Sequence, residues 1–158
     1  MGTFTQLMLG TLSVTLVAGC AGSSTRTPPP IRYGESACAE CRMLINEARF
    51  AVTAVTSSDE PVAFDSIECF VRSLQRDGQR LAHMWVHDYA GSRWIPADEA
   101  FYVISAELAT PMGQGVVAVG SASAARALAA QVHGREGTFA QLPTLIQRAG
   151  ASHHTRSE

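Results

Sequence analysis

The chain has 158 residues, of which 46% are hydrophobic and 16% charged, and its formal net charge is −2. Its basic residues are all arginines, with no basic run and no series of aromatic residues for base stacking, so nothing in the composition indicates nucleic-acid binding. No glycine-rich loop has the spacing that holds phosphates, and the length allows one domain with a single core.

The N-terminus resembles a bacterial lipoprotein signal. The apolar run Leu7–Val17 is shorter than the roughly 20 residues that cross a bilayer, but it fits the hydrophobic region of a secretory signal. It leads into LVAGC, which resembles a lipobox ending at Cys20, although no Lys or Arg precedes the run. We therefore expect residues 1–19 to be a signal peptide and Cys20 to carry the lipid. Ala21, where an aspartate would favour inner-membrane retention, favours the periplasmic leaflet of the outer membrane.

Composition divides the rest of the chain into three parts. Residues 20–36 are small, polar and Pro-rich, which is typical of a tether. Residues 37–147 form the predicted domain, and residues 148–158 are predicted to be a disordered tail.

The segment CAECRM places Cys38, Cys41 and Met43 within six positions. If the segment is extended, Cys41 and Met43 project to the same side, and two thiolates with a thioether are soft ligands that select Cu(I). A redox pair is usually found at the start of a helix, whereas the residues that follow here indicate a strand. A structural zinc site needs four ligands, which this segment lacks. A disulfide between Cys38 and Cys41 remains an alternative.

The first half of the domain reads as strand, strand, helix, strand. Strands are expected at residues 50–56 and 62–64, a helix capped by Asp65 follows and ends near 77–78, and a strand spans 81–89. Cys69 lies in the first helical turn, away from the apolar stripe, where the helix dipole favours a thiolate. It is a candidate reactive thiol or further ligand, unless it is simply a small buried residue. His83 and His87 lie about 13 Å apart along the third strand, too far to bind one ion together.

The second half repeats this order, with strands at 101–108 and 116–119, a helix at 121–132 and a strand at 138–142. VAFDSIECFVRSL (62–74) aligns with VAVGSASAARALA (117–129), which predicts an α+β fold of two tandem ββαβ units. The second hairpin loop is the longer one because of residues 110–115. Met112 in this loop is a protruding thioether that either closes over a metal or fills a gap.

These motifs together resemble the NosL family, lipoprotein accessory factors of nitrous oxide reductase. The matching segments, in order, are LVAGC, CAECRM, FDSIECFVRSL, HDYAGSRWIPADEAFYV and TPMGQGVVAVGSASAA. The resemblance implies a fold similar to organomercurial lyase and a periplasmic Cu(I) chaperone that serves the reductase or its assembly machinery. It implies that the metal ligands come from Cys38, Cys41, Met43, Cys69 and Met112. Two positions depart from the family pattern: Arg42 stands where a glycine is common, and Phe70 where a methionine is frequent.

Two functions of different classes are therefore expected, besides a third possibility that the protein is a lipid-tethered docking module whose cysteines only hold a loop together. The first is a carrier without enzymatic activity, which holds Cu(I) through Cys38, Cys41 and Met43 with Met112 as a lid or third sulfur. The alternative is a thiol enzyme, for disulfide exchange or for cleavage of a carbon–metal bond. Such an enzyme needs Cys69 paired with Cys38 or Cys41, and an acid such as Asp65 nearby.

Overall fold

The computed structural model describes residues 27–77, 81–91 and 93–154. The predicted signal peptide and Cys20 lie outside these residues. None of the helices in the described ranges has the length and apolarity that would let it span a bilayer.

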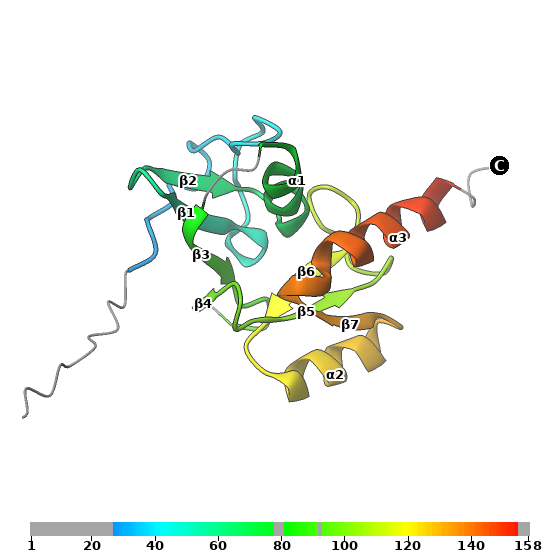
Figure 1. The fold of residues 1–158 in the computed structure, drawn as a ribbon. Coiled ribbons are helices and arrows are strands. Elements are labelled where there is room, and N and C mark those ends of the chain that lie inside the picture. Colours follow the sequence, from blue (N-terminus) through cyan, green and yellow to red (C-terminus); the bar gives the residue numbers. More distant parts are fainter. Residues whose placement is uncertain (1–26, 78–80, 92, 155–158) are drawn as a thin grey trace, which may run out of the picture.

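The first half of the domain is a four-stranded antiparallel sheet with one helix (Figure 1). After the short helix η1 (Ala48–Phe50), its elements are β1 (Val52–Thr56), β2 (Pro61–Phe64), α1 (Ile67–Asp77), β3 (Leu81–His87) and β4 (Trp94–Pro96). The strands are ordered β2-β1-β3-β4, so β1 is flanked by its hairpin partner and by the strand that follows the helix.

The second half repeats this arrangement in a three-stranded antiparallel sheet. Its elements are β5 (Phe101–Ile104), β6 (Val116–Val119), α2 (Ala122–Gln131), β7 (Arg135–Thr138), η2 (Phe139–Gln141) and α3 (Leu142–His154). The order is β6-β5-β7, which again puts the first strand between its hairpin partner and the strand after the helix. The α+β fold with two ββαβ units is therefore confirmed. The longer second hairpin is confirmed as well, because residues 57–60 join β1 to β2 whereas residues 105–115 join β5 to β6.

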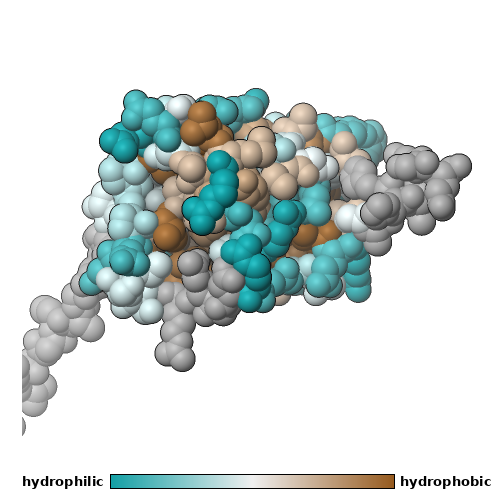
Figure 2. Space-filling model, turned by 90° about the horizontal axis from the view of Figure 1, so that it is seen from above, coloured by the Kyte–Doolittle hydropathy of each residue, from teal (hydrophilic) through white to brown (hydrophobic). Residues whose placement is uncertain are grey.

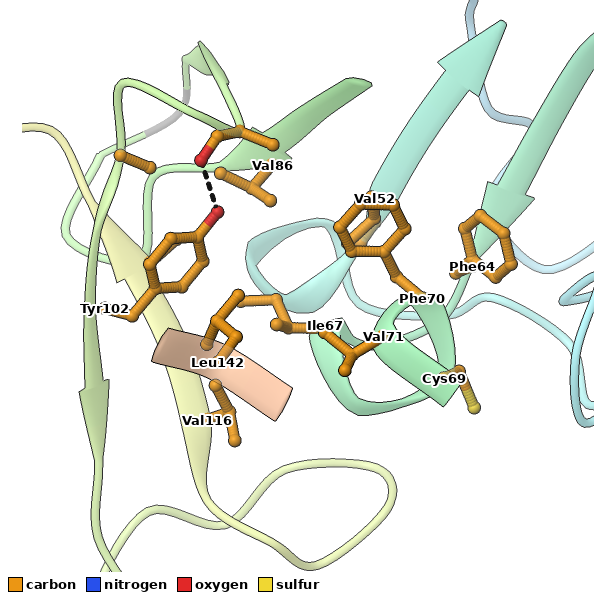
Figure 3. Close-up of a cluster of buried hydrophobic side chains, with 14 of the residues drawn as sticks. Val52, Phe64, Ile67, Cys69, Phe70, Val71, Val86, Tyr102, Val116 and Leu142 are labelled. Atoms are coloured by element: carbon orange, nitrogen blue, oxygen red, sulfur yellow. Dashed lines mark hydrogen bonds between the residues drawn. The ribbon is translucent and has the colours of Figure 1, made fainter. Parts of the chain in front are cut away.

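Both faces of the second sheet are covered. Val103 and Val117 pack with Ala125 and Ala129 of α2, whose small side chains allow the helix to lie close to the sheet. The neighbouring residues of the same strands, among them Tyr102 and Val116, face the other way and pack with α1 and α3 (Figure 3). Tyr102 donates a hydrogen bond to the carbonyl of Ala97 at 2.6 Å. Strands buried on both faces read as continuous apolar runs, as VVAV in β6 does.

The two halves are joined at the end of β3. Asp88 forms a parallel bridge with Ala118 of β6, and the Tyr89 N–H donates to the Ala118 carbonyl at 2.8 Å. One core cluster also contains residues of both halves, including Ile67, Val86 and Val116. The two units are thus packed as one body.

Several sequence-based boundaries were wrong. The fold begins before residue 37, since Ile31 packs against the core and Thr53 donates a hydrogen bond to the Pro29 carbonyl at 3.1 Å. At the other end, residues 138–142 are not a strand: β7 ends at Thr138 and α3 runs from Leu142 to His154, so the predicted tail is helical through residue 154. The three-residue edge strand β4 was not predicted.

Candidate metal centre

A tight turn positions the first two cysteines. The Arg42 N–H donates to the Cys38 carbonyl at 3.0 Å and the Cys38 N–H donates to the Met43 carbonyl at 2.8 Å, so residues 38–43 fold back on themselves. Arg42 is held at a φ of 67°, in the left-handed region that favours glycine. The Ala39 N–H donates to the Ala63 carbonyl of β2 at 2.9 Å, which fixes the turn beside the end of that strand.

The chain that leaves β2 supplies the other half of the site. Ser66 caps α1, because its Oγ accepts the N–H of Cys69 at 3.2 Å, three positions into the helix. The predicted cap at Asp65 was therefore wrong by one residue. Since Ser66 satisfies the helix terminus, the carboxylate of Asp65 is left to face the turn, where its Oδ2 accepts a hydrogen bond from the Cys41 thiol at 3.6 Å.

Three thiols and one carboxylate converge between these two segments. The Sγ atoms of Cys38, Cys41 and Cys69 and a carboxylate oxygen of Asp65 all lie within 4.8 Å of one another. All three cysteines are free thiols. Cys38 and Cys69 are fully buried, Cys41 is partly exposed, and the Oδ1 of Asp65 is buried without a hydrogen-bond partner among the described groups. Of these four side chains, only Cys41 is partly exposed to solvent.

The three thiols differ in pKa: that of Cys38 is lowered, whereas those of Cys41 and Cys69 are raised. A hydrogen bond from the Cys69 thiol, helped by backbone N–H groups, lowers the pKa of Cys38 to about 6. Donating that proton raises the pKa of Cys69, as do its burial and the nearby charge of Asp65. Burial raises the pKa of Cys41. These surroundings favour the thiolate on Cys38 and the protonated thiol on Cys41 and Cys69.

The two methionines predicted as ligands lie in different surroundings. Met43 is 56% exposed, and the turn with its left-handed Arg42 interrupts the extended segment from which Met43 was expected to share a side with Cys41. Met112 is partly buried and packs against the core cluster that includes Cys38 and Cys69. The loop that carries Met112 is bonded to Glu68, the residue before Cys69. The cysteine-bearing turn of α1 and the thioether loop are therefore neighbours.

Large apolar side chains are exposed in and near the turn that carries the thiols. Among the described residues, these are Tyr33, Met43 and Leu44. This part of the chain lies at the top of Figure 1, so Figure 2 looks onto it from above. Apolar residues occupy the middle of that face between hydrophilic ones. The partly exposed Cys41 is thus followed within three positions of the chain by two exposed apolar side chains, Met43 and Leu44.

Comparison with known proteins identifies the family of this chain. The family model described as NosL matches residues 32–146 of this chain. The chain belongs to the NosL family. A solved structure, the crystal structure of the copper chaperone NosL from Shewanella denitrificans, superposes with a TM-score of 0.63 at 21% sequence identity, covering 72% of this chain and 96% of that one. At this identity the likeness establishes the fold. No curated protein sequence matches the chain.

In this NosL chain, the four converging ligand atoms come from the first ββαβ unit and from the turn that precedes it. The alignment at an offset of 55 residues places Gly120 opposite Asp65 and Ala124 opposite Cys69. The caps nevertheless match, because Ser121 Oγ accepts the Ala124 N–H at 3.2 Å just as Ser66 does for Cys69. Sequence reasoning named Asp65 as an acid for the alternative enzyme, but not as a member of the metal cluster. Ser121, which aligns with Ser66, was the signal in the sequence that Ser66 rather than Asp65 caps the helix.

The two histidines of β3 do not join the cluster. His83 stacks on Trp85 at a centroid distance of 6.0 Å, and His87 packs edge-on against Trp94 at 4.9 Å. Both side chains therefore have packing partners on the first sheet, away from the four converging ligand atoms.

Proposed function

We propose that this NosL protein is a periplasmic, lipid-anchored carrier of Cu(I) that delivers copper for assembly of the copper centres of nitrous oxide reductase, without enzymatic activity of its own. Its cargo is the metal ion, and its partner is the reductase or the assembly machinery of the reductase. The N-terminal lipobox supports the anchor at Cys20, and family membership supports the periplasmic location and the partner.

The observation that carries the proposal is the convergence of three free thiols within 4.8 Å. Sulfur ligands are soft and select Cu(I) over harder ions. The thiolate of Cys38 provides a negative charge before the ion arrives, and Cys41 and Cys69 release protons as they bind. The partly exposed Cys41 gives an incoming partner a sulfur to replace first, so transfer proceeds by ligand exchange across the apolar face around it.

The experiment is a competition for Cu(I) under anaerobic, reducing conditions. The protein, in a Cys20→Ser background that removes the anchor thiol, is titrated with Cu(I) against bicinchoninic acid. One Cu(I) per chain is expected to be retained. Cys38→Ser and Cys69→Ser should each weaken retention at least tenfold, whereas Met84→Leu, which removes a thioether from β3, serves as the control. A wild-type protein that surrenders all of its Cu(I) to the chelator contradicts the proposal.

The position of Asp65 supports a second candidate, a thiol enzyme. Its carboxylate lies 3.6 Å from the Cys41 sulfur and close to two further thiols, which is the acid-and-thiol set that such chemistry needs. Turnover distinguishes the candidates. A disulfide exchanger should reduce insulin with dithiothreitol as electron source, and a carbon–metal lyase should release the hydrocarbon from an organomercurial; a carrier should do neither above the rate of free thiols.

A further inference from the structure

A buried carboxylate that the metal cluster does not use lies beside it. Glu68 is the second residue of α1 and only 1% exposed. Its Oε1 accepts the hydroxyl of Thr110 at 2.6 Å and the N–H of Val116 at 3.4 Å, while Oε2 is buried with no hydrogen-bond partner among the described residues. Burying a carboxylate is costly unless it is hydrogen-bonded. Glu68 is therefore buried with only one of its two carboxylate oxygens hydrogen-bonded among the described residues.

Those two bonds hold both ends of the Met112 loop. The Thr110 hydroxyl, while donating to Glu68, accepts the N–H of Gly115 at 3.1 Å. Gly115 has a φ of +68° and lies so close to the Ser105 carbonyl that a Cβ there would be 1.7 Å from the oxygen. The two ends of the loop from Thr110 to Val116 are thus held close together, and both ends are hydrogen-bonded to Glu68 in the first turn of α1. Met112 lies within this loop.

The two halves of the molecule show that this contact is not required by the fold. In the second copy, the position equivalent to Glu68 is Ser123, which is exposed. In the first copy, the hairpin connection is only residues 57–60. The buried carboxylate and the long loop are both additions to the shared ββαβ frame, and they contact each other one residue away from Cys69.

We propose that Glu68 is a positioning residue for metal binding, which acts through Thr110 to hold the Met112 thioether over the thiol cluster. This inference rests on the proposed function. When the bond between the carboxylate and the hydroxyl is lost, the loop opens more often, the thioether spends less time near the thiols, and bound Cu(I) is exposed to competing ligands.

The rate at which Cu(I) leaves the protein tests this inference. The loaded protein, again in the Cys20→Ser background, is mixed with excess bicinchoninic acid, and formation of the coloured complex is followed. Thr110→Val keeps the side-chain shape but removes the donor, and it is expected to release Cu(I) about tenfold faster, as for loss of a hydrogen bond to a charged group. Glu68→Gln should release it faster as well. Thr110→Ser, which keeps the hydroxyl, should restore most of the difference.

A double-variant comparison separates positioning from a general loss of stability. In a Met112→Leu background, Thr110→Val should not accelerate Cu(I) release further, because the loop held by the Glu68–Thr110 hydrogen bond then carries no sulfur. Equal acceleration in both backgrounds, or release from Thr110→Val at the wild-type rate, overturns the inference while leaving the proposed function intact. A wild-type protein that retains no Cu(I) overturns both. If Thr110→Val does not fold, Glu68→Gln with and without Met112→Leu gives the same comparison.

Discussion

Cys38 is the residue whose chemistry depends most directly on its neighbours. It is fully buried, yet the hydrogen bond from the Cys69 thiol outweighs its desolvation and lowers its pKa to about 6. Metal capture by a thiolate does not have to displace a proton. The site is therefore prepared for a soft cation at neutral pH by a contact between two segments 31 positions apart in the sequence.

The first prediction concerns this contact. In the reduced apo protein with Cys20→Ser, one thiolate should appear in the absorbance at 240 nm as pH rises through about 6, and Cys38→Ser should abolish the step. Cys69→Ala removes the donor that contributes most to the shift, so the pKa of Cys38 should rise toward 9 and the step should move to higher pH. A step that stays near pH 6 in Cys69→Ala would show that backbone N–H groups alone lower the pKa.

Proton competition also sets the pH dependence of copper affinity. Above pH 6, only Cys41 and Cys69 still hold protons, and each one that binds Cu(I) makes the affinity rise about tenfold per pH unit. Below pH 6, Cys38 must also lose a proton, so the dependence should steepen by a further factor of about ten per unit. Competition titrations between pH 5 and 8 measure both slopes, and a slope that is constant through pH 6 contradicts the assignment of the acidic thiol to Cys38.

Arg42 is the strained residue of the turn. A non-glycine residue in the left-handed region costs about 1 kcal/mol, and Arg42 is exposed with a φ of 67°. Arg42→Gly should therefore raise the free energy of unfolding by a few tenths to about 1 kcal/mol in a urea titration, after the entropy of glycine is counted. Arg42→Ala keeps the Cβ and the strain, so it should give no such gain; equal gains from both would instead implicate the guanidinium.

Part of the site was readable from the sequence and part was not. The C-x-x-C spacing and the first-turn position of Cys69 drew attention to all three thiols, because both are local patterns. The thiolate expected on Cys69 was wrong, because the pKa of Cys69 is raised and Cys38 is the acidic thiol. The extended course expected for residues 41–43 was wrong because Arg42 adopts a left-handed conformation, which the alternation of side chains cannot predict. Asp65 was misassigned because aspartate and serine are both good caps, and adjacent candidates differ only in where the helix begins.

At the scale of elements, the helices and strands with a clear hydrophobic periodicity were predicted, and the strands without one were not. β1, β2, α1, β5, β6 and α2 carry β-branched runs or a helical stripe, and all were predicted near their true positions. β4 is three residues long with Pro96 at its end, too short for any periodicity to show. The sequence REGT of β7 has no apolar alternation, so it gave no strand signal. The strand forms by backbone pairing with β5, and Gly137 leaves room for Leu145 of α3.

The matching helix caps provide a prediction at this scale. Ser121→Ala should lower the free energy of unfolding by about 1 kcal/mol, the usual value of a serine cap. Ser66→Ala should cost at least as much, because Ser66 is fully buried and leaves the Cys69 N–H without its acceptor. Arg126→Ala, at an exposed position further along α2, is the control. Urea titrations followed by circular dichroism measure all three, and an effect at Ser121 but none at Ser66 would return the cap of α1 to Asp65.

At the scale of the whole molecule, the shared core decides whether the two ββαβ units unfold together. Both tryptophans lie in the first unit, in β3 and β4, while Val117 is fully buried in the second, against α2. Because the main core cluster contains α1, β3, β5, β6 and α3 side chains, loss of packing in one unit should destabilise the other. Val117→Ala should lower the free energy of unfolding by about 2 kcal/mol.

That loss should be visible from the other half of the molecule. Tryptophan fluorescence, which reports on the first unit, and circular dichroism, which reports on both, are expected to show one coincident urea transition, shifted by the same amount in Val117→Ala. Arg126→Ala, at an exposed position of α2, should move neither by more than about 0.5 kcal/mol. An unchanged fluorescence midpoint beside a shifted dichroism signal would mean that the units unfold independently. The thiol cluster of the first unit and the Met112 loop of the second unit would then unfold independently of each other.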